Sequence, residues 1–422
     1  MALPPAEPVS LDEVRREVAQ WLETSWDPEL SLLEWRTRLA DSGWACPTWP
    51  RDWCGRGLPQ TAAGVVAEEL QRIGAVGVPD GVGMMLAAPT ILEHGPDELR
   101  RRLVRATVTG ELTWCQLFSE PGAGSDLAGL TTRADRDGDE WILNGQKVWN
   151  TSAHHADLGL LLARTRWDVP KHRGITCFAV EMRQPAIDVR PLRQMNGHAS
   201  FNEVFLQDAR VPVSNVIGAV DDGWAVALTT LAHERRLAAH RRTSAPGGAA
   251  GRTLQEATTE FALANAAYSW YPQRAGRVDL VIERAVAVGR DVDPVVRQEI
   301  ARVLSLASAA QWTAQRAAAA RLLGRPPGPE GSLGKLAASN IARAAAHTHS
   351  LIAGSSGLLS GADAPLAGTI TEVLISVPAV SIAGGTDEIQ RNIIGERVLG
   401  LPREPALDRD VPFRDVVRNA GR

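Results

Sequence analysis

The spacing of apolar and polar positions divides the chain into three stretches. Up to about residue 112 the apolar residues recur at helical intervals, as in VRREVAQWLE and TAAGVVAEELQRIGA. The next stretch has short alternating or continuously apolar runs, as in LGLLLART and GITCFAVEM, which predict strands. After Gly223 the chain is helical again and rich in Ala, Leu and Arg. We therefore predict an α+β protein with an N-terminal α-helical domain (1–112), a middle β domain (113–218) and a C-terminal α-helical bundle (219–422).

Local signals predict several element boundaries. The sequence SLDE at Ser10–Glu13 has the form of a capping box before the first helix. Asp293 followed by Pro294 is typical of a helix start, with the aspartate as N-cap. The dipeptides Asp137-Gly138 and Asn144-Gly145 have the form of turns on either side of a strand.

Composition narrows the classes of function. The chain has 422 residues, of which 44% are hydrophobic, enough for two or three domains with their own cores. The formal net charge of −4 argues against a nucleic-acid-binding protein, which needs a basic face. The four cysteines are scattered, no apolar leader precedes the first helix, and no long apolar run occurs. We therefore expect a cytoplasmic protein with reduced thiols and no membrane span.

The stretch FSEPGAGSDLAG (118–129) is a candidate ligand-binding loop, because it is rich in glycine and follows a strand-like segment. It lacks the spacing of dinucleotide-binding and P-loop motifs, so alone it predicts a simple tight turn about equally well. Three further segments follow it in order: NGQKVWNTSA (144–153), MNGHASFNEVFLQDARVP (195–212) and GGTDEIQRNIIGERVLG (384–400).

Together these four segments resemble the acyl-CoA dehydrogenase family over essentially the whole chain. In sequence they are similar to actinobacterial members that process bulky or unusual acyl groups. The resemblance implies an N-terminal helical domain, a middle β-barrel-like domain and a C-terminal four-helix bundle. It also implies that FAD binds between the β domain and the bundle. No Cys or His motif for flavinylation accompanies these segments, so we expect the FAD to be held without a covalent link.

The resemblance assigns contacts in the middle domain to individual residues. The implied cofactor contacts there are Gln116, Phe118, Ser119, Gly124, Ser125, Trp149 and Thr151. Ser125 is also implied to lie at the entrance used by the CoA thioester. An indole suits the flat apolar ring of a flavin, and hydroxyl and amide groups suit its heteroatoms, although Trp149 alone would be read as a core residue. Asn150 stands where the family usually has an aliphatic residue.

The last segment completes the implied site. Gly384 and Gly385 suit a turn without side chains, and Thr386 suits the cap of the following helix. The resemblance implies that Thr386 and Glu388 reach the FAD and that Gly385 lies against the substrate.

A weaker match concerns the start of a long helix. Arg297 and Gln298 resemble the pair that contacts FAD from a neighbouring subunit. A surface arginine held in an ion pair is the alternative interpretation.

The usual catalytic base of the family is missing from the last segment. That base is a glutamate immediately before the Gly-Thr, and Gly384 occupies this position. Either the base lies elsewhere or the chain is catalytically silent. On the helix after the β domain, Trp224, Ala227, Leu231 and Ala238 form a predicted apolar stripe. Glu234 falls within this stripe, which predicts an inward-facing carboxylate.

Two interpretations of Glu234 follow. Helical geometry alone favours a structural ion pair, with Arg235 or Arg236 as partner. A minority of the family, however, is similar to this chain in having glycine at the usual position and its base on this helix, as Glu before Arg. The resemblance therefore implies Glu234 as base, Arg235 as a substrate-side residue and the Gly384 N–H as donor to the thioester oxygen.

The resemblance also implies the reaction and its partners. Removal of the α-proton by Glu234 and transfer of the β-hydrogen to FAD would give a trans-2-enoyl-CoA, and the electrons would pass to an electron-transfer flavoprotein. The implied assembly is a homotetramer or heterotetramer, a dimer of dimers. An acyl-CoA oxidase or flavin monooxygenase on the same fold, and a non-catalytic partner subunit of a heteromeric acyl-CoA dehydrogenase, are the alternatives. The close histidine pairs lack further ligands at metal-binding spacing, so we expect no metal.

Overall fold

The computed structural model describes residues 10–237, 247–248, 250–322, 328, 330–405 and 408–416. The chain divides into two compact units. One comprises Met1–Leu192, Ser200–Ala267 and Asp408–Arg422, and the other comprises Arg193–Ala199 and Tyr268–Leu407. The division into three domains at residues 112 and 218 separates the chain by type of element rather than by packing, and it stays a prediction.

The first unit begins with helices, as the periodicity predicts. They are α1 (Leu11–Ser25), α2 (Leu32–Ser42), α3 (Ala62–Arg72), α4 (Ala88–His94) and α5 (Asp97–Thr109). Helix α1 starts after Ser10, but the Ser10 side chain makes no cap hydrogen bond, so the predicted capping box is not formed. Ser10 is exposed, and water can satisfy the first N–H groups there. A capping box forms instead between Ser31 and Glu34, at the start of α2.

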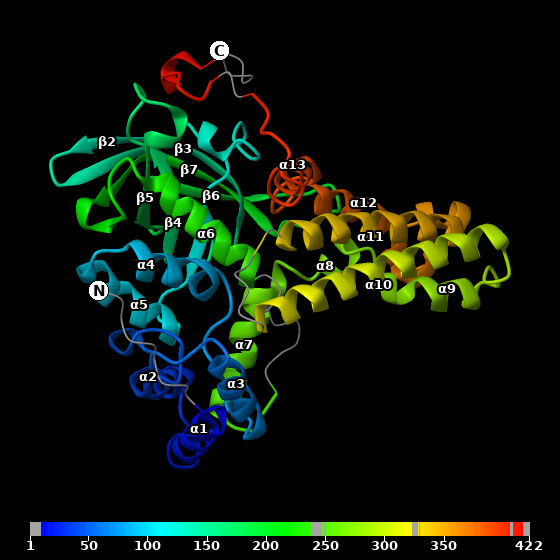
Figure 1. The fold of residues 1–422 in the computed structure, drawn as a ribbon, viewed down its shortest axis with the longest axis horizontal. Coiled ribbons are helices and arrows are strands. Elements are labelled where there is room, and N and C mark those ends of the chain that lie inside the picture. The colour runs from blue at the N-terminus through cyan, green and yellow to red at the C-terminus, as the bar shows by residue number, and fades with distance from the viewer. Residues whose placement is uncertain are drawn as a thin grey trace. The chain divides into compact units, whose positions relative to one another are not determined.

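A mixed eight-stranded sheet follows these helices (Figure 1). Its strands are β1 (Trp114–Leu117), β2 (Arg133–Asp137), β3 (Glu140–Thr151), β4 (Leu158–Arg164), β5 (Ile175–Glu181), β6 (Ile187–Leu192), β7 (Phe201–Pro212) and β8 (Val216–Ile217). The order is β6-β7-β3-β2-β4-β5-β8, and β1 pairs with β4 in parallel. Strand β4 is buried on both faces, because Leu160 and Leu162 face the core shared with α4 and α5, while Leu161 faces the second core. This explains the continuous apolar run in its sequence.

The two predicted turns have different outcomes. Asp137-Gly138 joins β2 to β3, as expected from the dipeptide. Asn144-Gly145 forms no turn: both residues lie inside β3, opposite a bulge at Asp208 of β7. The Asn144 side chain donates to the Asp208 carboxylate (2.8 Å) and accepts from its backbone N–H (2.9 Å). Glycine is needed at 145 because a Cβ would lie 2.6 Å from the Thr132 hydroxyl oxygen.

Two helices complete the first unit. They are α6 (Gly223–Leu237) and α7 (Arg252–Ala266). Helix α6 packs on β5 and α4, and Val226 and Ala227 bury their side chains in the core that also holds Phe118 of the glycine-rich loop. This packing fixes the helix that carries Glu234 against the sheet.

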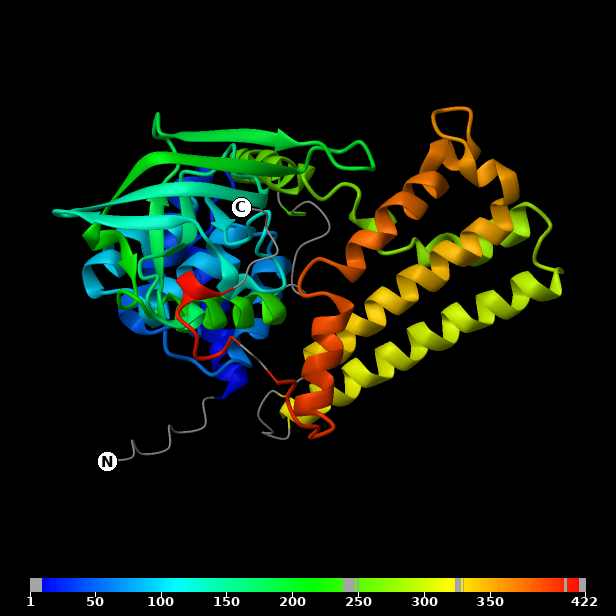
Figure 2. The same cartoon turned by 90° about the horizontal axis from the view of Figure 1, so that it is seen from above.

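The second unit is helical. Its helices are α8 (Tyr271–Arg274), α9 (Val281–Ala287), α10 (Pro294–Leu322), α11 (Glu330–Ala353), α12 (Thr369–Ser376) and α13 (Asp387–Arg397). Figure 2 shows the long helices α10 and α11 side by side, and α12 and α13 pack on α11. The predicted start of α10 is confirmed, since the Asp293 carboxylate accepts from the backbone N–H of Val295 (2.9 Å).

The chain order of helices, mixed sheet and helices confirms the predicted α+β class. Across the described part of the chain, no helix combines the length and apolar character that a membrane span needs.

Candidate functional site

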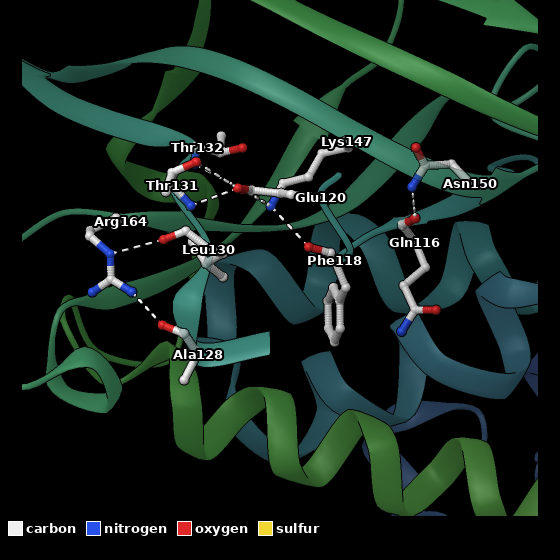
Figure 3. A network of polar contacts seen from close by, with 10 residues as sticks. All are labelled: Gln116, Phe118, Glu120, Ala128, Leu130, Thr131, Thr132, Lys147, Asn150 and Arg164. Atoms are coloured by element: carbon white, nitrogen blue, oxygen red, sulfur yellow. Dashed lines mark hydrogen bonds and ion pairs between the residues drawn. The ribbon is translucent and has the colours of Figure 1, made fainter. Parts of the chain in front are cut away.

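The structure brings together two of the segments in which cofactor contacts are predicted. Strand β1 and the start of the glycine-rich loop lie along β3 (Figure 3). The backbone N–H of Val148 donates to the Ser119 carbonyl (3.0 Å), and the Lys147 ammonium donates to the Phe118 carbonyl (3.0 Å). The Asn150 side-chain amide donates to the Gln116 carbonyl (2.7 Å). These contacts place Gln116 and Ser119 beside the Trp149–Thr151 stretch.

Trp149 is set apart by a bulge in β3. The register of β3 against β7 shifts between Val148 and Asn150, so Trp149 is the extra residue, with φ of +66°. Its indole is 56% exposed and meets the Phe201 ring edge-on at 5.7 Å. A non-glycine residue at positive φ is uncommon, and bulges often re-aim a side chain at a functional site. The bulge turns the indole out of the sheet and Asn150 into it.

The interior of this region holds an orphaned polar atom. Asn150 is 2% exposed, and its Oδ1 is buried without a hydrogen-bond partner in the described structure. Such an atom costs free energy unless a ligand or water serves it. With an open indole, half-buried Gln116 and Ser119 and the Thr151 hydroxyl alongside, the donor and acceptor set fits a large planar heterocycle such as a flavin.

The Phe118 side chain does not belong to this donor and acceptor set. Its ring is 4% exposed and lies in the hydrophobic core with residues of α5 and α6. The flavin contact expected at Phe118 stays a prediction, and the burial of its ring favours a contact through the main chain.

A buried ion pair holds the glycine-rich loop to the sheet. The carboxylate of Glu120 lies 2.9 Å from the Lys147 ammonium, and both side chains are almost completely buried. The carboxylate also accepts from the backbone N–H groups of Thr131 (2.6 Å) and Thr132 (2.8 Å) and from the Thr131 hydroxyl (2.8 Å). Glu120 thereby fastens the start of the loop to its end (Figure 3).

Burial and pairing act in opposite directions on this pair. Burial raises the pKa of Glu120, but the Lys147 charge and the donors of Thr131 and Thr132 outweigh it and lower that pKa to about 2. Burial lowers the pKa of Lys147, against the opposing effect of Glu120. The carboxylate is thus ionised at neutral pH, and the net stabilisation by the pair is smaller than the Glu120 shift alone indicates.

Arg164 at the end of β4 holds the far side of the loop. The buried guanidinium donates to the carbonyls of Ala128 (2.6 Å) and Leu130 (3.0 Å). Between these two anchors Gly124 and Ser125 are exposed, as expected for residues that meet a ligand. Sequence reasoning missed both anchors. A lysine within an otherwise half-buried strand is the one signal that predicts a buried acidic partner.

Helix α6 carries Glu234, whose side chain is partly buried. The predicted apolar stripe was only partly right. Trp224 and Leu231 pack at the margin of the core, and Ala238 lies outside the described residues. Ala227 is buried, as predicted. The other buried side chains among the described residues of α6 are Val226, Thr230 and His233.

Polar contacts with α4 explain this difference. The hydroxyls of Thr90 and Thr230 lie 3.0 Å apart, and the Thr229 hydroxyl lies 2.8 Å from Nε2 of His94. A periodicity of apolar residues does not reveal a face that is buried through hydroxyl and imidazole groups. Glu234 lies next to this face, beside His233. The backbone of Arg235 continues α6, and its side chain lies outside the described structure.

The Gly384–Gly385 turn lies in the second unit, ahead of α13. Both glycines have positive φ, +69° and +86°. Gln390 fixes the turn by donating to the carbonyls of Gly384 (3.1 Å) and Gly385 (3.3 Å). The predicted cap is confirmed, because the Thr386 hydroxyl accepts from the backbone N–H of Ile389 (3.3 Å). Glu388 is exposed, 3.3 Å from the Arg391 guanidinium.

Position 384 has room for a side chain. A Cβ there would meet only Cε of Lys335 among the described atoms, at 3.8 Å, whereas a Cβ at 385 would lie 2.6 Å from Nε2 of Gln390. Burial lowers the pKa of Lys335, which donates to the Val380 carbonyl (2.5 Å). Backbone conformation therefore favours glycine at both positions, and at 385 a side chain would also have to displace the amide of Gln390.

Arg297 and Gln298 lie exposed in the first turn of α10. The Arg297 guanidinium donates to the Asp291 carbonyl (3.3 Å). Their predicted contact with FAD of a neighbouring subunit stays a prediction.

Models of three acyl-CoA dehydrogenase domains match the chain in order. The N-terminal domain matches residues 9–111, the middle domain 115–209 and the C-terminal domain 275–399. The acyl-CoA dehydrogenase IpdE1 of Mycobacterium tuberculosis is 34% identical over 422 residues, which cover 93% of this chain and 98% of IpdE1. The chain belongs to the acyl-CoA dehydrogenase family. It is therefore an oxidoreductase that acts on acyl-CoA, in a family of flavoproteins.

Other acyl-CoA dehydrogenases extend this result. FadE34 of Mycobacterium tuberculosis is 39% identical over 86% of the chain, which spans 46% of FadE34. The solved "Tcur3481-Tcur3483 steroid ACAD" has a TM-score of 0.65 and 25% identity, with 95% of this chain and 100% of that chain covered. The ChsE4-ChsE5 complex from Mycobacterium tuberculosis gives a TM-score of 0.63 and 27% identity, with 95% and 100% covered.

Proposed function

We propose that this acyl-CoA dehydrogenase introduces an α,β double bond into an acyl-CoA thioester, with FAD as cofactor and Glu234 as base. The observation that carries the proposal is a paired departure from the family's usual pattern. Position 384 has no side chain although it has room for one, and a glutamate that precedes an arginine stands on α6. The first change removes the usual base, and the second supplies a carboxylate on a helix firmly held by α4 and the sheet.

Different residues of the chain would bind the cofactor, remove the proton and stabilise the thioester oxygen. Trp149, Thr151, Gln116 and Ser119 would hold the isoalloxazine of FAD, which when bound accepts the β-hydrogen as hydride. Glu234 takes the α-proton onto its carboxylate. In the second unit the Gly384 N–H would donate to the thioester oxygen, where negative charge develops as the proton leaves.

The remaining assignments concern the periphery of the same site. Ser125 and Gly124 would contact the cofactor, with Ser125 also at the CoA entrance. Thr386 and Glu388 would meet the FAD, while Gly385 and Arg235 would meet the substrate. Arg297 and Gln298 would contact the FAD of a neighbouring subunit.

The named relatives point to a substrate class. A structure described as a steroid ACAD matches nearly the whole chain at 25% identity. We therefore propose a bulky substrate of the steroid side-chain type, in lipid or sterol metabolism, and an electron-transfer flavoprotein as electron acceptor. Separate titrations of the reduced enzyme with that acceptor and with oxygen test this: rapid reoxidation by oxygen would favour an oxidase instead.

We also propose a homotetramer or heterotetramer. Helix α10 leaves Trp312 67% exposed and Leu304 43% exposed, which is costly for a lone subunit. The name of the solved ChsE4-ChsE5 complex gives two different chains, so our proposal includes a heterotetramer. A monomeric mass at micromolar concentration with FAD fully bound would rule out this assembly.

Flavin bleaching tests the proposed function. The purified protein, supplemented with FAD, is mixed without oxygen with acyl-CoAs from short linear to steroid side-chain types, and absorbance near 450 nm is followed, where flavins absorb. We expect bleaching with at least one bulky acyl-CoA. A protein that never binds FAD, alone or with a homologous chain, would contradict the proposal.

The missing side chain at Gly384 favours one second candidate, a non-catalytic subunit that completes a heteromeric dehydrogenase. Bleaching that occurs only when a homologous chain is co-expressed, and that survives removal of the Glu234 carboxylate, would establish it.

A further inference from the structure

A short segment after α13, Asp408–Val416, packs in the first unit on the connection between β4 and β5; we call it the strap. The Phe413 N–H donates to the Val169 carbonyl (2.8 Å) and the Arg414 N–H to the Trp167 carbonyl (2.9 Å). Pro412 pairs with Pro170 in a short antiparallel bridge. The match to the family's C-terminal domain ends at residue 399, so the strap lies beyond it.

The strap contacts one of the anchors of the glycine-rich loop. The Phe413 ring is 1% exposed, and the Arg164 guanidinium carbon lies 3.5 Å from its centroid. The Trp167 ring lies next to the Phe413 ring, with 5.6 Å between the two centroids. Arg164 in turn donates to the carbonyls of Ala128 and Leu130. An aromatic face beside a buried guanidinium stabilises its charge and fixes its plane. Phe413 thus limits how Arg164 can move away from the loop.

A second contact reaches the same loop independently. The Lys171 ammonium lies 2.7 Å from the Asp408 carboxylate and 3.0 Å from that of Asp126. Asp126 directly follows Ser125, the residue proposed at the CoA entrance. Lys171 has a 13% exposed side chain, so its charge is partly shielded from water and benefits from both carboxylates.

From these two contacts we infer that the strap is a positioning element of the acyl-CoA site: Phe413 through Arg164, and Asp408 through Lys171, hold residues 125–130 in their binding conformation. The inference rests on the proposed function, because it assigns CoA binding to this loop. No strap residue is assigned a contact with the substrate. The strap therefore affects KM for acyl-CoA, and kcat stays nearly unchanged.

Matched variants separate this role from general stability. Asp408→Asn removes the charge that faces Lys171, and Asp410→Asn makes the same change at an exposed strap residue for which no ion pair is found in the described structure. Phe413→Leu removes the aromatic face and keeps apolar bulk. Amide hydrogen exchange of residues 120–132 is measured on the protein without acyl-CoA, and KM and kcat are measured with the acyl-CoA that bleaches the flavin fastest.

We expect Asp408→Asn to raise loop exchange and KM by about 2- to 5-fold, and Phe413→Leu by about 2- to 30-fold. Asp410→Asn should behave as the parent, and kcat should stay within about 2-fold in all three. Unchanged loop exchange in Asp408→Asn and Phe413→Leu would overturn the inference, as would faster exchange with an unchanged KM. A parent protein that turns over no acyl-CoA would overturn the proposed function, and the exchange measurement would still decide whether the strap holds the loop.

Discussion

The glycine-rich loop and the Gly384–Gly385 turn are both proposed to meet a ligand, yet they are held by different means. Three buried charged side chains, the Glu120–Lys147 pair and Arg164, fix the loop from within the first unit. A single neutral side chain, Gln390, fixes the turn in the second unit.

The difference shows where each segment tolerates change. Buried charges hold a loop rigidly but leave a large penalty when one partner is lost. Neutral hydrogen bonds such as those of Gln390 cost less to lose, so the turn depends more on its positive-φ backbone conformation and on the space around it. This contrast predicts that charge changes disrupt the loop and that steric changes disrupt the turn.

The largest effect is expected from Lys147→Met. It leaves the Glu120 carboxylate buried without its cation and should lower the free energy of unfolding by about 3–5 kcal/mol. Urea denaturation checks this. The double variant Glu120→Gln with Lys147→Met removes both charges and should recover part of the loss. A single variant as stable as the parent would contradict the assigned role of the pair.

The same carboxylate gives the loop a pH dependence. The folded pKa of Glu120 is about 2, below its ordinary value of 4.5, so its contribution is fully present above pH 4.5 and is lost as pH falls toward 2. The loss is on the order of 2–3 kcal/mol. Stability measured between pH 5 and 2 should fall less steeply in the charge-free double variant than in the parent. Parallel curves would contradict this assignment.

In the turn, Gly385→Ala should cost more than Gly384→Ala. Both place a side chain at positive φ, at about 1–3 kcal/mol, but only the Cβ at 385 meets Nε2 of Gln390, at 2.6 Å. Displacing that amide also loosens its bonds to the two carbonyls. Thermal unfolding should show a lower Tm for Gly385→Ala. Equal Tm values would mean that Gln390 moves aside freely.

The smallest change is expected from Asn150→Ile, which installs the family's usual type of residue. Loss of the bond to the Gln116 carbonyl is offset by removal of the orphaned Oδ1, so stability should change by less than about 1.5 kcal/mol. FAD affinity should fall by more than the stability change explains, since Oδ1 is available to a bound ligand. Fluorescence titration of the apoprotein measures it, with Asn144→Leu on the same strand as control. An Asn150→Ile variant that binds FAD as tightly as the parent would exclude a contact between Oδ1 and FAD.

Much of this architecture was predictable, because apolar period and end signals act locally. The order of elements, the Asp293 start of α10 and the Thr386 cap of α13 are confirmed. The partners of the loop anchors were not predictable, since Lys147 meets Glu120 through a tertiary contact between β3 and the loop after β1. Asn144-Gly145 was misread as a turn because nothing local reveals the bulge at Asp208 that keeps it in the strand.

For the candidate site as well, some residues were predictable from the sequence and others were not. The motifs located Trp149 and Gln116, and the fold places them together through Asn150. Sequence periodicity identified only part of the buried face of α6, because Thr230 and His233 are buried by polar contacts that hydropathy does not record.

Two substitutions combined in one variant test whether Glu234 acts as the base. Adding Gly384→Glu to Glu234→Gln returns a carboxylate to the family's usual position. Among the described residues, Lys335 alone stands near a Cβ at 384, so recovery is limited mainly by the backbone strain of φ +69°. Partial recovery of activity would show that both positions serve one α-carbon.

The most direct test of the central claim is the rate of flavin reduction in Glu234→Gln. The amide is nearly isosteric with the carboxylate, so the variant should fold, bind FAD and bind acyl-CoA as the parent does. Stopped-flow bleaching without oxygen, with the best acyl-CoA of the panel, should be slower by about 10²–10⁴-fold, as expected when a general base is removed. Bleaching at the parental rate would contradict the assignment of Glu234 as the base.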